Sequence, residues 1–333
     1  MKVLFIGGTG IISSACSDLA VERGIDLYLL NRGESFRPAH PQAHHLFGDI
    51  RQPETISEIL NEHTFDVVVN WVAYTRQHVE TDLHLFRGRT GQYIFISSAS
   101  AYQTPPERLP VTEQTPLENP VWEYSRNKIA CEQYLLEAYA QIGFPVTIVR
   151  PSHTYDRTHL PIPGGYTTLE RMRQGKKVIV HGDGSSLWTL THHTDFARGF
   201  LGLLGHPQAI GEAFHITSDE FLTWNQIFAL TAQAIEVTPR LVHIPSELIA
   251  AYDPEWGAGL LGDKTHSMLF HNSKIKKLVP KFVAVIPFAS GVKEVVAWLD
   301  AHPNSRYIDD RFNTLVDRII AAYESAWPQP LDL

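Results

Sequence analysis

The sequence predicts an α/β protein built on a doubly wound parallel sheet, and two observations in its first half carry that prediction. One is a series of short runs that are apolar on successive residues, as strands covered on both faces are: Val3–Ile6, Leu27–Leu30, Val67–Val69, Tyr93–Ile96 and Val146–Val149. The other is the amphipathic helical pattern between these runs, near Ser13–Arg23, Glu54–Glu62, Arg76–Phe86 and Tyr124–Tyr139. Alternating strands and helices of this kind form a parallel sheet with helices on both faces.

The chain changes character after Pro151. Prolines and glycines gather in residues 151–165, and the next apolar runs are Val178–Val180 and Ala213–Ile216. Helical patterns follow near Trp224–Ala234 and Val292–Leu299. We therefore expect a large domain over residues 1–155, with a return of the chain to it around 176–217. Residues 156–330 are expected to form mainly a smaller C-terminal α/β cap that binds substrate.

Composition narrows the class of protein. Of 333 residues, 44% are hydrophobic and 19% charged, which is typical of a soluble globular protein. A net charge of −8 gives no general attraction to nucleic acid or to anionic membranes. The two cysteines, Cys16 and Cys131, make no disulfide framework. No apolar run approaches about 18 residues, so we expect no membrane span and a cytoplasmic location.

A glycine-rich loop follows the first predicted strand. Its residues are Gly7, Gly8, Thr9 and Gly10, and a helix is expected to begin near Ile11 and Ile12. Free backbone N–H groups and the helix dipole favour negative charge at such a helix start, and glycine allows a close approach to phosphate. We therefore predict a dinucleotide-binding, Rossmann-type domain with these six residues at the pyrophosphate. An ordinary glycine-rich turn is the alternative.

Two further segments suit the adenosine half of a dinucleotide. Asn31 and Arg32 end the second strand, where an acidic residue would hold the ribose hydroxyls and repel a 2′-phosphate. Arg32 in that place favours NADP over NAD slightly, although a solvated turn residue or stacking on adenine would also explain it. Asp49 and Ile50 follow Gly48, where a carboxylate meets the adenine amine or simply closes a turn.

The residues Ser98, Tyr124 and Lys128 suit proton transfer. Tyr124 and Lys128 are four residues apart and share one helix face. A phenol with an ordinary pKa near 10 becomes a better base when a nearby ammonium stabilises its phenolate. We expect Tyr124 and Lys128 to contact the cofactor as well, with Lys128 holding its ribose. Ser98 follows a predicted strand and would hydrogen-bond the reacting oxygen of the substrate. A Tyr-x-x-x-Lys pair alone is common on solvated helices, but its place after Ser98 and the glycine loop predicts catalysis.

The chain resembles the extended and atypical short-chain dehydrogenases/reductases of the NAD-dependent epimerase/dehydratase family over nearly its whole length. The segments that carry the likeness are Gly7–Gly10, Gly48–Ile50, Val72-Ala73, Phe95–Ser98 with Tyr102, Tyr124–Lys128, Arg150-Pro151 with Tyr155, Gly182–Gly184, Asp195 and Asn272–Lys274. The resemblance implies that Ser98, Tyr124 and Lys128 are the catalytic triad. It also implies that Ala73 and Pro151 line the nicotinamide side, with Val72 beside them, and that the protein forms a homodimer.

Departures from the family pattern bear on the substrate. Family members that dehydrate nucleotide sugars carry an acidic pair where this chain has Ala99 and Ser100, which argues against 4,6-dehydration. Trp188 stands where many members have an arginine for the diphosphate. A smaller or less charged substrate with a stackable face fits Trp188 better, core packing being the alternative. Ser100 and His153 are further candidates for substrate contact, and a purely structural histidine is the alternative for His153.

Two functions remain open from the sequence. The first is an NAD(P)-dependent oxidoreductase or epimerase that acts on a hydroxyl or ketone carbon of a sugar-like or other small polar substrate. The second is a non-catalytic dinucleotide- or RNA-binding scaffold related to chloroplast stem-loop-binding proteins, against which the net charge of −8 argues. No metal is expected, because the chain has neither a His-Glu-x-x-His nor a Cys-x-x-Cys pattern, and surface or core positions explain most of its 17 histidines.

Overall fold

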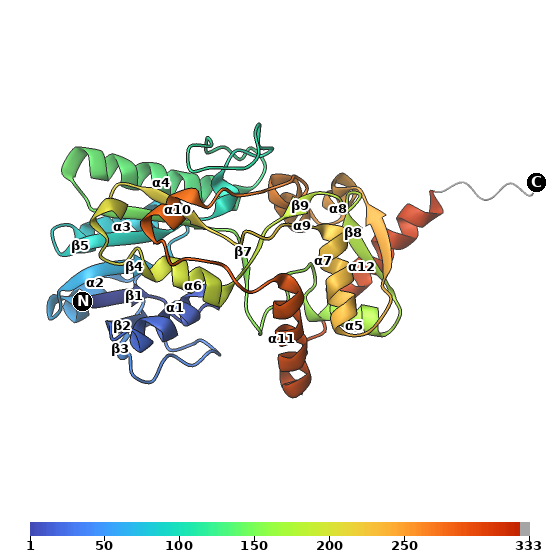
Figure 1. The fold of residues 1–333 in the computed structure, drawn as a ribbon, viewed down its shortest axis with the longest axis horizontal. Helices are drawn as coiled ribbons and strands as arrows, with labels where there is room; N and C mark the ends of the chain where they lie inside the picture. The colour runs from blue at the N-terminus through green and yellow to red at the C-terminus, as the bar shows by residue number, and fades with distance from the viewer. Residues whose placement is uncertain (327–333) are drawn as a thin grey trace, which may run out of the picture.

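A seven-stranded parallel sheet organises the protein, of which the computed structural model describes residues 1–326 (Figure 1). Its strands are β1 (Lys2–Ile6), β2 (Asp26–Asn31), β3 (His44–Phe47), β4 (Phe65–Asn70), β5 (Thr90–Ile96), β6 (Val146–Pro151) and β11 (Ala213–Ile216). Their spatial order is β11-β6-β5-β4-β1-β2-β3, and neighbouring pairs are all parallel. The order reverses between β1 and β4, which confirms the predicted doubly wound, Rossmann-type sheet.

Helices cover both faces of this sheet. One face carries α1 (Ile11–Glu22), α6 (His193–Leu201) and α10 (Ser273–Leu278). The other face carries α2 (Pro53–Asn61), α3 (Arg76–Phe86) and α4 (Glu123–Ile142). The helices expected in the first half are all present, and α3 has the expected bounds.

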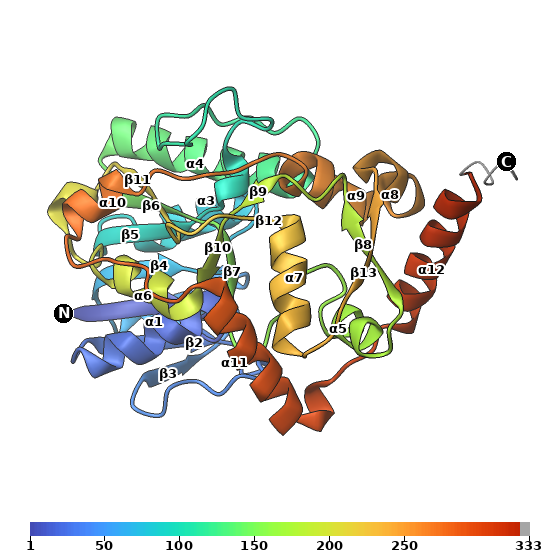
Figure 2. The ribbon, with the colours of Figure 1, turned by 45° about the vertical axis from the view of Figure 1, so that its right-hand side comes forward.

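A second group of elements lies beyond the carboxyl ends of the main strands (Figures 1 and 2). Its strands pair two by two: β7 (His153–Tyr155) with β10 (Leu190–His192), β8 (Lys177–His181) with β13 (Arg240–Ile244), and β9 (Leu187–Trp188) with β12 (Leu222–Thr223). Its helices are α5 (Tyr166–Arg173), α7 (Trp224–Ala234), α8 (Ser246–Tyr252), α9 (Pro254–Gly259), α11 (Phe288–Ala301) and α12 (Asp310–Ser325). Short turns are η1 (Ala99–Ala101), η2 (Pro207–Ala209), the π-helical η3 (Leu260–Lys264) and η4 (Pro303–Ser305).

Within the described residues, the chain returns from this second group to the main sheet twice, first with α6 and β11 and later with α10. Helix α6 packs on α1, and β11 then pairs with β6. Strand β8, within the expected return, pairs with β13 instead. The end of the predicted cap, residues 327–330, lies outside the described residues, and the division into two domains stays a prediction.

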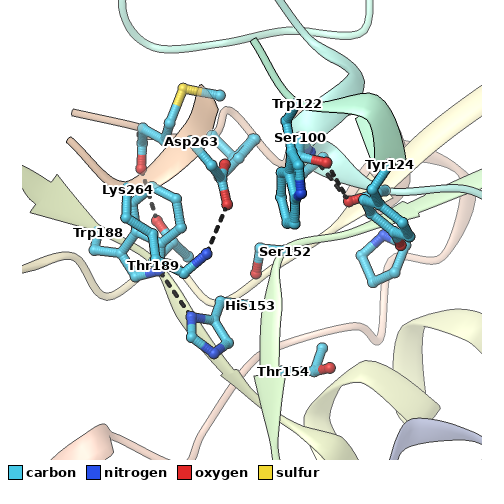
Figure 3. A pocket seen from close by; sticks show the side chains of 15 residues that line it. Ser100, Trp122, Tyr124, Ser152, His153, Thr154, Trp188, Thr189, Asp263 and Lys264 are labelled. Atoms are coloured by element: carbon cyan, nitrogen blue, oxygen red, sulfur yellow. Dashed lines mark hydrogen bonds and ion pairs between the residues drawn. The ribbon is translucent and has the colours of Figure 1, made fainter. Parts of the chain in front are cut away.

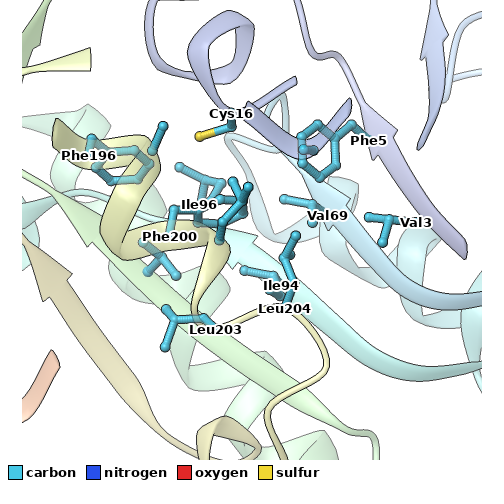
Figure 4. Packing of buried hydrophobic residues seen from close by; sticks show 14 of the residues in the cluster. Val3, Phe5, Cys16, Val69, Ile94, Ile96, Phe196, Phe200, Leu203 and Leu204 are labelled. Atoms are coloured by element: carbon cyan, nitrogen blue, oxygen red, sulfur yellow. The ribbon is translucent and has the colours of Figure 1, made fainter. Parts of the chain in front are cut away.

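The side chains between α1, α6 and the sheet form a continuous apolar cluster (Figure 4). Phe5 on β1 contacts Phe200 on α6 edge to face, with 6.1 Å between ring centroids. Cys16 is fully buried there, and burial raises the pKa of its thiol well above the ordinary value. Each buried phenylalanine stabilises the fold by roughly 1.5–3 kcal/mol through removal of apolar surface from water. This cluster fixes α1, and with it the glycine loop that precedes the helix.

Candidate active site

A pocket opens where β5 and β6 end and the second group begins (Figure 3). Ligands of open α/β sheets bind outside the carboxyl ends of the strands, which is where this pocket lies. Six predicted residues line it: Ser98, Ser100, Tyr124, Pro151, His153 and Trp188. Segments more than 160 residues apart in sequence, from Ser98 to Phe270, contribute to its walls. The structure therefore brings together the predicted catalytic hydroxyls and all of the predicted substrate contacts.

Ser98 begins a short chain of hydroxyl groups. It is the N-cap of η1, where its Oγ accepts a hydrogen bond from the backbone N–H of Ser100 at 3.2 Å. The hydroxyls of Ser98 and Ser100 are 2.9 Å apart, and Ser125 donates to Ser100 over 2.8 Å. These contacts hold the Ser98 hydroxyl at the pocket wall.

Tyr124 and Lys128 occupy one face of α4, as their spacing predicts. Loss of water around the phenol raises the pKa of Tyr124 to about 12, although a hydrogen bond with Ser98 opposes that rise. Lys128 is almost fully buried, and its Nζ donates to the backbone oxygens of Ala73 and Ile96, each at 2.7 Å. Burial lowers the pKa of Lys128 to about 8, because a charged ammonium is poorly solvated there.

Behind these residues, Glu132 forms a buried ion pair. Arg150, at the end of β6, donates from Nε to Glu132 Oε1 at 2.9 Å, and both side chains are almost fully buried. Ser97 also donates to Glu132, so that β5, α4 and β6 meet at one carboxylate. Glu132 lies one helical turn beyond Lys128 and therefore anchors the helix that carries the predicted catalytic pair.

A second cavity lies over the first three strands. It is lined by seven of the predicted cofactor-binding residues: Gly7, Thr9, Asn31, Arg32, Asp49, Ile50 and Val72. Tyr74 lines it as well, and Lys128 Nζ lies 4.8 Å from the Tyr74 ring centroid and 5.8 Å from that of Tyr124. Lys128 thus lies between a wall residue of the second cavity, Tyr74, and a wall residue of the first, Tyr124.

Five predicted cofactor residues support this cavity without lining it. Gly8 is buried beneath the loop, and Gly10 is the N-cap of α1, with Ile11 and Ile12 in the first helical turn. Ala73 is buried and offers its backbone oxygen to Lys128.

The backbone of the glycine loop fits a dinucleotide. Gly7 and Gly8 have φ of +103° and +104°, which a residue with a Cβ adopts only under strain. A Cβ at Gly8 would stand 2.7 Å from Leu29 Cδ2, so glycine is required there for packing as well. The loop leads into the N-terminus of α1, whose first turn has no acidic side chain to compete with a phosphate.

The ribose end of the cavity carries charges of both signs. Arg32 has a side chain 56% exposed, with Nη2 3.1 Å from Glu34 Oε2 and Nη1 3.9 Å from Asp49 Oδ2. A 2′-phosphate would therefore gain Arg32 but meet two carboxylates beside it. The geometry permits either nicotinamide dinucleotide.

Trp188 and His153 form a pair at the far wall of the first pocket. Trp188 Nε1 donates to His153 Nδ1 at 3.1 Å, which leaves the ring proton of a neutral His153 on Nε2. Burial, followed by the nearby Lys264, lowers the pKa of His153 well below its ordinary value. Trp188 is only 4% exposed and packs against Trp224, with 5.7 Å between ring centroids. It therefore combines core packing with an edge that faces the pocket.

Several residues that line the pocket were not singled out from the sequence, and three of them, Trp122, Asp263 and Lys264, are aromatic or charged side chains that could contact a substrate. Trp122 precedes α4 by one residue, and its position beside Tyr124 was the available clue. Asp263 and Lys264 lie on η3, about 140 residues from Tyr124, where no recognised spacing marks them.

The family model described as the NAD dependent epimerase/dehydratase family matches residues 3–217. This chain belongs to the NAD-dependent epimerase/dehydratase family. The match spans the seven strands of the main sheet, including all residues predicted to be catalytic.

Individual relatives agree with this membership. A chloroplast stem-loop binding protein of 41 kDa from Arabidopsis thaliana is 28% identical over 262 residues, which are 73% of this chain and 65% of that protein. A UDP-glucose 4-epimerase from Lactobacillus helveticus is 31% identical over 169 residues, 45% of this chain and 51% of the epimerase. The aligned part thus spans between half and two thirds of the length of these two relatives.

Solved structures share the fold at low identity. The UDP-glucose 4-epimerase of Bifidobacterium longum in complex with NAD+ and UDP has a TM-score of 0.74 at 18% identity, over 92% of this chain and 100% of that one. The dTDP-glucose 4,6-dehydratase of Bacillus anthracis in complex with NAD has a TM-score of 0.73 at 19% identity, over 91% and 98%.

Residues 1–326 lack two features that mark other classes of function. Within that range, no helix is both long and apolar enough to cross a membrane. Nor do three or more His, Cys, Asp or Glu side chains gather there in a way that would hold a metal ion.

Proposed function

We propose that this protein transfers a hydride between a nicotinamide dinucleotide and a hydroxyl or ketone carbon of a sugar-like substrate, as an oxidoreductase or an epimerase. The observation that carries the proposal is the position of Lys128, between Tyr124 in the wall of the pocket that Ser98 also lines and Tyr74 in the wall of the glycine-loop cavity. Family membership and the NAD printed for related structures support it.

The surroundings of the three residues support a separate role for each. Ser98 donates its hydroxyl proton to the substrate oxygen and polarises it. Tyr124 takes or returns the proton of that oxygen, which requires its phenolate to be stabilised. Lys128 supplies the nearest ammonium, and its two hydrogen bonds to backbone oxygens hold that charge in place. A bound nicotinamide supplies the hydride acceptor or donor, which no side chain provides.

Substitution at two of these positions tests the mechanism. Tyr124→Phe removes the proton carrier and Ser98→Ala removes the oxygen donor, so we expect turnover to fall by a factor on the order of 10²–10⁴. Dinucleotide affinity, measured by calorimetry, should stay within about threefold because neither side chain lines the second cavity. Tyr139→Phe, on an exposed part of the same helix, is the matched control. Turnover at the wild-type rate in Tyr124→Phe would exclude the proposed role.

Choice of dinucleotide belongs to the same proposal, with a slight preference for NADP. Arg32 is the residue that would contact a 2′-phosphate, by exchanging its contact with Glu34 for the phosphate. We expect Arg32→Gln to weaken NADP binding about tenfold and to leave NAD binding nearly unchanged, in calorimetric titrations of both. Equal effects on the two dinucleotides would contradict the preference.

Binding of RNA is the second candidate function, since a chloroplast stem-loop binding protein is among the relatives. The net charge of −8 opposes it. A stem-loop RNA titrated at increasing salt separates the two functions, because phosphate-driven binding is tight at low salt and falls steeply. Such binding, retained in Tyr124→Phe, would favour the scaffold over the enzyme.

A further inference from the structure

The turn η3 places a single ion pair in the wall of the substrate pocket (Figure 3). Lys264 Nζ lies 3.2 Å from Asp263 Oδ2, and the two side chains are 20% and 11% exposed. Among the described residues that line this pocket, these two are the ones with a formal charge, since the lowered pKa of His153 keeps that ring neutral. The pocket wall therefore carries no net charge.

The pair is held in place by the protein. The backbone oxygen of Lys264 accepts hydrogen bonds from His181 Nε2 at 3.0 Å and from Ser186 Oγ at 3.1 Å. On the other side of the turn, Asn119 Nδ2 donates to the oxygen of Gly262 at 2.6 Å. A Cβ at Gly262 would stand 2.7 Å from Trp122 Cβ, so the glycine lets η3 lie against Trp122.

Two indole rings frame the ion pair. Lys264 Nζ lies 5.2 Å from the ring centroid of Trp122 and 5.7 Å from that of Trp188. Indole faces attract the ammonium and also pack against the C–H faces of a sugar-like ring. Carboxylate, ammonium and indole together match a ring that has alternating hydroxyls and an apolar face.

This arrangement is poorly suited to a diphosphate. A diphosphate needs cations whose charge is not already balanced, and the one ammonium here is paired with Asp263 at close range. The carboxylate would repel the ligand in a partly dehydrated wall, where like charges weaken binding strongly. Trp188 supplies no charge to offset that repulsion.

We propose that the Asp263–Lys264 pair selects an uncharged, polyhydroxylated ring as the substrate, with hydroxyls that donate to Asp263 and accept from Lys264 while the ring packs on Trp122. This inference rests on the proposed function, because it assigns the substrate class of the same site. It differs from the substrates printed for the related epimerases, which are sugar nucleotides.

Ligand binding to the full-length protein tests the inference independently of turnover. Calorimetry and tryptophan fluorescence, in the presence of NAD, compare D-galactose, D-glucose and myo-inositol with glucose 1-phosphate and UDP-glucose. We expect wild-type protein to bind at least one neutral ring about tenfold more tightly than either anionic ligand. Tighter binding of UDP-glucose than of every neutral ring overturns the inference, as does failure of every neutral ring to bind.

Charge variants show whether the Asp263–Lys264 pair causes the preference for neutral over anionic ligands. Asp263→Asn leaves Lys264 without its carboxylate, so the ratio of anionic to neutral affinity should rise at least tenfold. The double variant Asp263→Asn with Lys264→Gln restores a neutral wall, and the ratio should return toward the wild-type value. If circular dichroism shows that Asp263→Asn and the double variant are folded, an unchanged ratio of anionic to neutral affinity in Asp263→Asn contradicts the role of the pair.

The outcomes separate this inference from the proposed function. Ring selectivity is an equilibrium property and should persist in Tyr124→Phe, which is inactive under the proposed mechanism. Selective ring binding without hydride transfer in wild-type protein would leave the inference standing and remove the proposed reaction. If the protein transferred hydride to a sugar nucleotide and bound no neutral ring, the proposed reaction would stand and the inference about the substrate class would be wrong.

Discussion

Burial of the charged Lys128 side chain lowers the stability of the folded protein. Its ammonium is buried under α4 with two backbone oxygens as hydrogen-bond acceptors, and burial lowers its pKa to about 8. A lysine held in this way is less stable charged in the folded protein than in the unfolded chain. Under the proposed function, Lys128 is needed for the charge it places 5.8 Å from the Tyr124 ring centroid, not for a contribution to stability.

The lowered pKa gives a pH prediction with a definite sign. Between about pH 8 and 10.5 the unfolded chain holds the Lys128 proton more tightly than the folded protein does, so folding stability gains with rising pH. Lys128→Met lacks this gain. The free energy of unfolding of the variant, relative to wild type, should therefore fall by roughly 3 kcal/mol as pH rises through this window.

Urea unfolding at several pH values between 7 and 10.5 measures the difference. Lys281→Met, at an exposed position, is the control and should show a difference independent of pH. A pH-independent difference for Lys128→Met would mean that the lysine is better solvated than its burial indicates.

At the residue scale, the sequence predicts the position of a site residue where its place along a single helix or strand determines which residues lie beside it. Tyr124 and Lys128 share a face because they are four apart on a helix, and Ser98 is placed by the end of its strand. Lys264 could not be found in this way, because η3 reaches the pocket through tertiary packing on Trp122 and Asn119. Local pattern carries no information about such a contact.

At the scale of elements, helix α4 carries two residues of the proposed mechanism and connects them to the sheet. Its inner face carries Tyr124, Lys128 and Glu132 in successive turns, and Glu132 meets Arg150 of β6 and Ser97 after β5. The periodicity of the sequence predicted this helix within three residues of its end at Ile142. Short strands such as β9 and β12, two residues each, were missed because no periodic pattern exists over so few positions.

Glu132 gives the prediction for this element. Glu132→Gln leaves Arg150 buried without its counter-charge, and loss of one partner from a buried pair costs about 3–5 kcal/mol. Glu137→Gln, on the exposed face of α4, should change stability by less than about 0.5 kcal/mol. Urea denaturation measures both, and similar small losses in the two variants would contradict an anchoring role for Glu132.

At the scale of the whole molecule, the pocket depends on the joint between the sheet and the second group of elements. Helix α6 contributes to the apolar cluster on the sheet, whereas α11 packs in a separate cluster around Tyr155 and Trp224. Asp195 of α6 connects them, since its Oδ2 accepts from the backbone N–H groups of Val285 at 3.0 Å and Ile286 at 2.8 Å, just before α11. Sequence resemblance singled out Asp195, but its partners lie 90 residues away and only the fold reveals them.

Loss of the Asp195 carboxylate should weaken the contact between the sheet and the second group and lower the stability of the whole protein. Asp195 is 1% exposed, and Asp195→Asn replaces charged acceptors of two backbone N–H groups by an amide that satisfies them incompletely. We expect a loss of about 2–4 kcal/mol in the free energy of unfolding. Arg198→Gln, which removes the half-exposed partner of the same carboxylate, should cost less than about 1 kcal/mol.

Two probes of the urea transition show whether the sheet and the second group unfold as one cooperative unit. Far-ultraviolet circular dichroism follows the whole chain, and tryptophan fluorescence reports on the surroundings of individual side chains, among them Trp188 and Trp224 in the second group and Trp71 in the cluster on the sheet. If Asp195 holds one cooperative unit together, both curves coincide in wild type and move together in Asp195→Asn. Separation of the two curves in wild type would show instead that the sheet and the second group unfold independently, and that the pocket forms by the docking of two stable parts.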